Sequence, residues 1–142
     1  MWRKILVGHD GSEGAKKALS VAVTLASQLG AEIHTISVEE KLPHYAATVG
    51  EVEVMESKQE AAEYFRKIAA EAQQTAKAAG VTLRCHVLPG HEVETIVTFA
   101  KDHGFELLVI GFMGHSKIFG RIWGSTSQNL TKLSPCTVLV VK

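Results

Sequence analysis

The chain has 142 residues, of which 46% are hydrophobic and 21% charged, so its composition is that of a globular protein and excludes a largely disordered chain. Fifteen Lys and Arg residues balance fifteen Asp and Glu residues, so the net charge is zero and no basic surface for nucleic acid is expected. No apolar run reaches the roughly 18 residues that cross a bilayer, and the first strand pattern begins too early for a signal peptide. We therefore expect one cytoplasmic domain over residues 1–142, with neither nucleic acid nor membrane as a partner.

Apolar runs and helical periodicities alternate along the chain. In order they predict a strand at 4–8, a helix at 12–29, a strand at 32–38, a helix at 55–79, a strand at 82–88, a helix at 91–103, a strand at 107–111, a helix at 126–133 and a strand at 137–141. The strand runs are almost continuously apolar, which is typical of strands covered by helices on both faces. The pattern predicts a three-layer α/β fold with an open parallel five-stranded sheet.

Glycines are placed to end three of these helices, at Gly30, Gly80 and Gly104. The stretch 39–53 is read as a long connection, which either lies over a ligand site or is a plain surface linker. The apolar face of the second helix is expected to include Ala62 and Phe65. Cys85 and Cys136 lie in apolar runs and form no CxxC pair, so buried free thiols are expected.

The segment after the fourth strand carries the strongest functional signal. Gly111 and Gly114 are followed, after nine intervening residues, by Gly124-Ser125, and the helix that begins at Thr126 opens with hydroxyl residues. Glycine lets the backbone approach a ligand closely, and a helix start offers unpaired N–H groups and a partial positive charge. We interpret this segment as a nucleotide phosphate loop. Lys117 and Arg121, which lie within it, either neutralise phosphate charge or are solvated.

A second candidate ligand segment ends the first strand, where the sequence reads Gly8-His9-Asp10-Gly11-Ser12. If the first and fourth strands are neighbours at a switch point of the sheet, both ends face one crevice, and Asp10 lies on the side of the ribose or base. The alternative is that residues 10–12 form only a turn and a helix cap. Neither the P-loop motif nor the Rossmann glycine motif is present.

With these residues identified, the whole chain resembles the ATP-binding branch of the universal stress protein family. The resemblance rests on the opening residues 5–12, on the G-2x-G-9x-G-[ST] pattern from Gly111 to Ser125 and on the closing residues 134–141. It implies the strand order 3-2-1-4-5 of adenine nucleotide alpha hydrolase-like folds. It also implies that the chain binds ATP with Mg or Mn on the phosphates, without a metal site built from protein groups alone.

The resemblance also implies a set of nucleotide-binding positions. Base and ribose lie near Gly8, His9, Asp10 and Val38, phosphates lie near Gly111, Gly114, Gly124, Ser125 and Thr126, and Ile110 and Met113 line the nucleotide. The sequence departs from the family pattern in two places. His9 stands where valine or a small residue is usual. Phe112-Met113 replaces the small or basic residues that often stand between the first two glycines, and the bulk of Phe112 narrows the pocket.

Two further expectations concern assembly and activity. The strand 137–141 lies at a sheet edge in the implied order and carries no charge before Lys142, which favours a homodimer paired through this strand. No carboxylate is placed near the proposed phosphates as a base, so a nucleotide-dependent regulatory or stress-response module is favoured over an enzyme. The alternatives are a slow ATPase or phosphoryl- or adenylyl-transfer enzyme on the same fold, and a flavoprotein subunit, which would show bound flavin.

Overall fold

The computed structural model describes residues 1–40, 58–112 and 125–142. Their elements are, in chain order, β1 (Lys4–Gly8), α1 (Glu13–Leu29), β2 (Glu32–Glu39), α3 (Lys58–Ala78), β3 (Leu83–Pro89), α4 (Glu92–Asp102), β4 (Leu107–Gly111), α5 (Ser125–Leu133) and β5 (Thr137–Val141). Every strand and helix predicted from the sequence is present within these ranges. The three strands expected at 4–8, 107–111 and 137–141 have the predicted bounds.

The five strands form one sheet in the order β3-β2-β1-β4-β5, and all neighbouring pairs are parallel. β1 is therefore central, and its neighbours are β2 and β4. Val7 of β1 lies opposite Val109 of β4, so the carboxyl ends of these two strands meet at the same edge of the sheet. This confirms both the predicted parallel α/β fold and the strand order that the resemblance implied.

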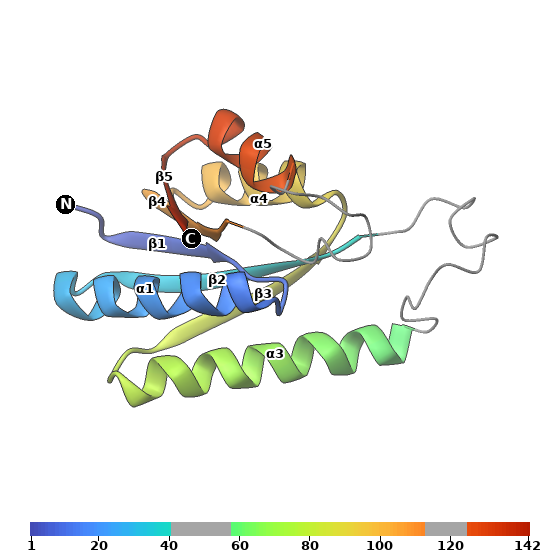
Figure 1. Ribbon diagram of the computed structural model, residues 1–142, viewed down its shortest axis with the longest axis horizontal. Helices are drawn as coiled ribbons and strands as arrows, with labels where there is room; N and C mark the ends of the chain where they lie inside the picture. Colours follow the sequence, from blue (N-terminus) through green and yellow to red (C-terminus); the bar gives the residue numbers. More distant parts are fainter. Residues whose placement is uncertain (41–57, 113–124) are drawn as a thin grey trace.

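The sheet lies between two layers of helices, with α1 and α3 on one face and α4 and α5 on the other (Figure 1). Successive strand residues point to opposite faces, so β1 supplies Ile5 and Val7 to the α1–α3 core and Leu6 to the opposite core. α1 ends at Gly30, which adopts the left-handed conformation at φ 63° that glycine reaches without a Cβ penalty. This confirms the predicted helix stop.

Two expectations about burial were wrong. On α3 the buried residues are Ala61, Phe65, Ile68, Ala72 and Ala76, whereas Ala62 is exposed. Alanine is frequent on both faces of this helix, so its periodicity alone does not fix the buried stripe within one residue. Both cysteines are free, as expected, but they are only partly buried. Within the described ranges, no helix has the length and apolar character needed to cross a membrane.

Candidate functional site at the carboxyl ends of β1 and β4

The end of β1 turns directly into α1 through a capped turn. The main-chain N–H of Ser12 donates to Asp10 Oδ1 at 2.9 Å, which closes an Asx turn. The Ser12 hydroxyl then accepts the N–H of Ala15 at 3.1 Å and caps α1. The turn-and-cap reading of residues 10–12 is therefore correct for Ser12. The same contacts hold Asp10, a partly buried residue, beside the first turn of α1.

The end of β4 packs against that same first turn. A Cβ built on Gly111 would lie 2.7 Å from the carbonyl carbon of Gly14 and 3.1 Å from the nitrogen of Ala15. These are backbone atoms, so only a glycine at 111 allows β4 and α1 to approach this closely. The sequence predicted Gly111 as a residue that brings the backbone near a phosphate. The structure supplies a packing reason for the same glycine.

The start of α5 is tied to the end of β4. The buried Ser127 hydroxyl donates to the carbonyl oxygen of Gly111 at 2.8 Å. The main-chain N–H of Phe112 donates to the carbonyl of Val141 at 2.9 Å, which fixes the backbone just past β4. Ser125 and Thr126 begin α5 and directly precede Ser127. The described ends of β1 and β4 and the first turns of α1 and α5 are thus held together.

His9 is buried beneath the turn. Its side chain is only 5% exposed, and its Nδ1 accepts the main-chain N–H of Gly11 at 3.3 Å. Its main chain is bonded to β2 on both sides, because its N–H donates to Ile36 and its carbonyl accepts from the Ser37 hydroxyl at 2.7 Å. Burial lowers the pKa of His9 below its ordinary value of 6.5, although Asp10 acts in the opposite direction. The neutral ring therefore supports the turn from within.

A residue that the sequence analysis missed, Tyr64 of α3, completes the turn. Its hydroxyl donates to the carbonyl oxygen of Asp10 at 2.5 Å. Gly11, at φ 84°, lies directly against that hydroxyl, and a Cβ at this position would overlap it. The sequence shows only a tyrosine next to Phe65 of the predicted apolar face, and nothing in the local pattern links α3 to residue 10.

The predicted nucleotide-binding residues fall into three groups. Those at the carboxyl ends of β1, β2 and β4 lie side by side along one edge of the sheet, and they are Gly8, His9, Asp10, Val38, Ile110 and Gly111. Ser125 and Thr126 begin α5. Met113, Gly114, Lys117, Arg121 and Gly124, together with the part of the 39–53 connection beyond residue 40, lie outside the described residues. In the described ranges no three His, Cys, Asp or Glu side chains gather as metal ligands.

Comparisons with known proteins agree with this arrangement. The model of the universal stress protein family matches residues 1–142. Universal stress protein YxiE of Bacillus subtilis is 32% identical over 148 residues, with the whole of both chains covered. The structure of the universal stress protein UspA from Lactobacillus plantarum superposes with a TM-score of 0.80 at 25% identity, covering 99% of this chain and 98% of that one.

A second solved structure has a bound ligand. It is a universal stress protein in complex with cAMP, which is 27% identical to this chain and has a TM-score of 0.76. The two cover 99% of this chain and 97% of that protein. Together with the match over the full sequence, the strand order and the glycine-bearing ends of β1 and β4, these similarities establish the chain's family. The chain belongs to the universal stress protein family.

Proposed function

We propose that this protein binds an adenine nucleotide at the carboxyl ends of β1 and β4 and uses it as a regulatory ligand in a stress response. One observation carries the proposal: Gly111 at the end of β4 packs on the first turn of α1, so the two predicted ligand segments lie at one place. This is the switch point of the sheet, where strand order reverses and α/β folds bind ligands. The related protein in complex with cAMP supports an adenine nucleotide as the ligand class.

The residues present fit such a ligand by their chemistry. Asp10 offers a carboxylate suited to ribose hydroxyls, and Gly8 adds no side chain beside Ile110. Ser125 and Thr126 bring hydroxyls to the start of α5, where main-chain N–H groups and the helix dipole favour an anion. The phosphates would extend toward this helix start, and the base would lie nearer to Val38 of β2.

The proposed physiological ligand is ATP with Mg or Mn on its phosphates. Hard divalent cations prefer oxygen ligands, and they commonly bind through substrate phosphates with one or two carboxylates. No described group of three acidic or histidine side chains gathers to hold a cation alone. The phosphate oxygens would therefore be its main ligands.

The energetics call for contacts to the whole nucleotide. A helix N-terminus contributes about 0.3–2 kcal/mol to anion binding, whereas micromolar affinity needs about 8 kcal/mol. Contacts to base and ribose must therefore supply most of the binding energy. This favours recognition of the nucleoside over binding of free phosphate.

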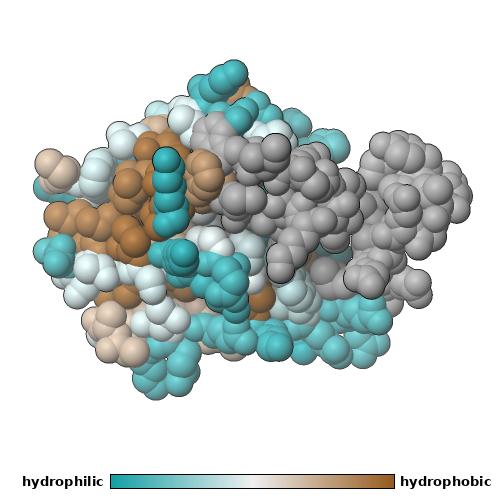
Figure 2. Space-filling view, viewed as in Figure 1, coloured by the Kyte–Doolittle hydropathy of each residue, from teal (hydrophilic) through white to brown (hydrophobic). Residues whose placement is uncertain are grey.

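We further propose that the protein is a homodimer paired through β5. β5 is an edge strand, and its residues Val138 to Val141 are only partly buried in one chain. Figure 2 shows hydrophobic side chains gathered on the face where β5 lies in Figure 1. A shallow groove beside this strand is lined by Lys16, Lys17, Val21 and Val141, among others. An unpaired apolar edge of this kind favours pairing with a second copy.

Binding is tested first by identifying what the purified protein carries. Mass analysis of the acid-denatured supernatant should detect an adenine nucleotide, and calorimetric titration of nucleotide-free protein should show saturable binding of ATP with Mg. Asp10→Asn should weaken binding about tenfold, because it removes the charge while its amide oxygen can still accept the Ser12 N–H. Asp102→Asn, at an exposed position at the end of α4, is the matched control.

Incubation of the protein with ATP and Mg, followed by a phosphate assay, distinguishes binding from turnover. A regulatory ligand should be recovered intact after incubation with Mg, whereas steady phosphate release would show the slow ATPase alternative. If ATP, ADP, AMP and cAMP all fail to bind at millimolar concentration, the nucleotide proposal is wrong.

A further inference from the structure

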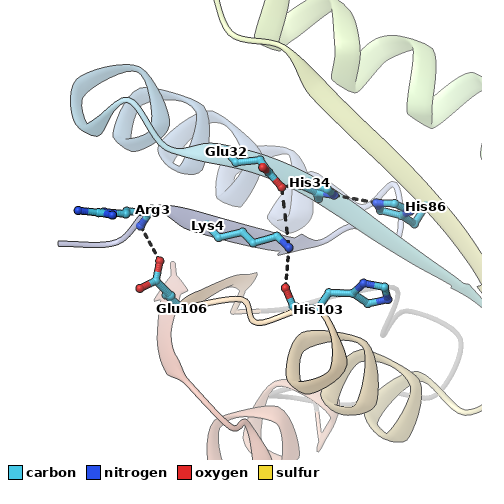
Figure 3. A network of polar contacts seen from close by, with 7 residues as sticks. All are labelled: Arg3, Lys4, Glu32, His34, His86, His103 and Glu106. Atoms are coloured by element: carbon cyan, nitrogen blue, oxygen red, sulfur yellow. Dashed lines mark hydrogen bonds and ion pairs between the residues drawn. The ribbon is translucent and has the colours of Figure 1, made fainter.

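A chain of polar side chains runs from the amino-terminal ends of β1 and β2 to the middle of β3, on the sheet face that α4 covers (Figure 3). Glu32 at the start of β2 contacts His34, with Oε2 and Nε2 2.6 Å apart. His34 in turn contacts His86 of β3, with Nδ1 and Nε2 2.8 Å apart. Lys4 of β1 lies 3.9 Å from the same glutamate oxygen. None of these residues takes part in the proposed nucleotide site.

The two imidazoles meet edge to edge. Their ring planes are 8° apart and their centroids 5.0 Å apart, yet their nearest nitrogens are separated by only 2.8 Å. Rings stacked face to face would be held at about 3.5 Å or more by van der Waals contact. The separation of the ring centroids exceeds the separation of the two nitrogens by about two ring radii. The two nitrogens therefore lie close to the line that joins the ring centroids. This is the geometry of a hydrogen bond, whereas two ligands of one metal point at a third position.

When both imidazoles are neutral, their hydrogen-bonding partners determine which ring nitrogen carries the proton. Ionised Glu32 can only accept, so His34 Nε2 donates to it. A neutral imidazole has a single N–H, which leaves His34 Nδ1 as an acceptor and requires His86 Nε2 to donate. His34 is buried, and in this arrangement both of its nitrogens are bonded. With the proton on Nε2 in both rings, every hydrogen bond in the series Glu32–His34–His86 has one donor and one acceptor.

The response to acid follows from this arrangement. A first proton can bind Nδ1 of His86, and His86 then still donates through Nε2 to His34. A second proton must bind Nδ1 of His34, which places two N–H donors and two positive charges against each other across the same gap. The first protonation therefore keeps the contact between β2 and β3, and the second breaks it.

The surroundings oppose the second charge. The cationic or titratable groups near the pair are Lys4 on β1, Arg84 on β3 and His103 at the end of α4, and Glu32 on β2 is the carboxylate that faces it. Phe99 of α4 packs against the His86 ring, and Phe105, two residues before β4, packs against the His34 ring. Burial and the neighbouring positive charges lower the pKa of His86 below its ordinary 6.5. The bond to His34 lowers the pKa of Glu32, which keeps it ionised as the acceptor.

We propose that His34 and His86 form a two-histidine proton-binding site, which accepts one proton with the β2–β3 contact intact and releases that contact when it binds a second. β3 is an edge strand of the sheet, so this contact joins it to the interior through side chains as well as through the backbone ladder. The site makes the β3 edge sensitive to acid.

Histidine ring NMR on the full chain, labelled with ¹⁵N, tests the proposal directly. Between pH 8 and pH 4 the two rings should titrate as a coupled pair in two steps more than about one pH unit apart. At neutral pH, His34 should carry its proton on Nε2. Amides of β3 should lose protection from exchange after the second step, before those of β4. Two independent single-step titrations, or a proton on Nδ1 of neutral His34, would overturn the proposal.

Variants provide a second measurement. A lowered histidine pKa means that the unfolded chain takes up the proton first as pH falls below 6.5, so stability is lost from there downward. His86→Gln should reduce this loss between pH 6.5 and pH 4 and abolish the coupled two-step behaviour of the pair. His91→Gln, at an exposed position before α4, should keep both steps. If zinc shifts both rings and a chelator reverses the shift, a metal is the ligand and the proton-site proposal is wrong.

Discussion

The hydroxyl of Tyr64 on α3 donates a hydrogen bond to the main-chain carbonyl of Asp10, 54 residues earlier in the chain, at 2.5 Å. The bond joins a helix of one outer layer to the turn that leaves the central strand. Gly11, with a positive φ, lies against this hydroxyl, and a residue with a Cβ at this position would overlap it. The tyrosine can therefore reach the turn only because residue 11 is a glycine. The position of Asp10, the carboxylate we assign to the nucleoside, therefore depends on a distant helix.

Tyr64→Phe should lower the free energy of unfolding by about 1 kcal/mol, the usual net contribution of one hydrogen bond. It should also weaken ATP binding, because the Asp10 turn loses its support from α3. Urea unfolding and calorimetric titration measure the two effects. Thr24→Val removes an exposed hydroxyl that donates to the Ser20 carbonyl within α1, and it should leave ATP affinity unchanged. Equal ATP affinity in Tyr64→Phe and the parent protein would contradict the positioning role.

Gly11→Ala should destabilise the protein by about 1–3 kcal/mol, because an alanine at φ 84° is strained and its Cβ overlaps the Tyr64 hydroxyl. The cost should shrink in a Tyr64→Phe background, where the overlapping oxygen is absent, while the backbone strain remains. A double-mutant cycle by urea unfolding measures the coupling between the two positions. Additive effects would show that the two residues do not meet as described.

Gly111→Ala should cost about 1–3 kcal/mol of stability, in the range of an overpacked core, because its Cβ would press on the backbone of α1. Gly8→Ala is the matched comparison, since its Cβ would make only an ordinary contact with Ile110 at 3.4 Å. Thermal unfolding of both variants without nucleotide isolates the packing effect. Similar melting temperatures for the two would argue that α1 moves freely away from β4.

The stability of the protein should fall on acidification, in part through His9. The folded pKa of His9 is lowered by burial, so the unfolded chain binds the proton first, and the stability present above pH 6.5 is lost as pH falls toward the folded pKa. His9→Asn offers an amide oxygen in place of Nδ1 but does not titrate. Its unfolding free energy should vary less between pH 7 and pH 5 than that of the parent or of a His91→Asn control.

Val141→Lys should shift the proposed dimer toward monomer, because it places a charge in the partly buried end of the β5 edge. Val87→Lys makes the same change on the opposite edge strand, where Val87 is 43% exposed, and should leave the assembly unchanged. Sedimentation velocity at several protein concentrations distinguishes the two. A parent protein that is monomeric at every concentration would rule out pairing through β5.

Much of the fold was predictable because its signals are local. Apolar runs, helical stripes and the stop at Gly30 depend on residues a few positions apart, and the observed strand bounds match them closely. The switch-point rule had already suggested that the ends of β1 and β4 share one site if the two strands are neighbours, and the resemblance to a known family added the strand order. The turn and helix cap that the sequence offered as the alternative for residues 10–12 is present in the structure, since those preferences are also local.

What the sequence by itself determined is the set of elements, their order and the residue types gathered at the carboxyl ends of the strands. Only the tertiary structure decided that Gly111 is needed by the backbone of α1, that Tyr64 supports Asp10, and that His34 and His86 meet edge to edge. Each of these contacts joins segments far apart in the chain. Their geometry arises only when strands pair and helices pack, which no local pattern records.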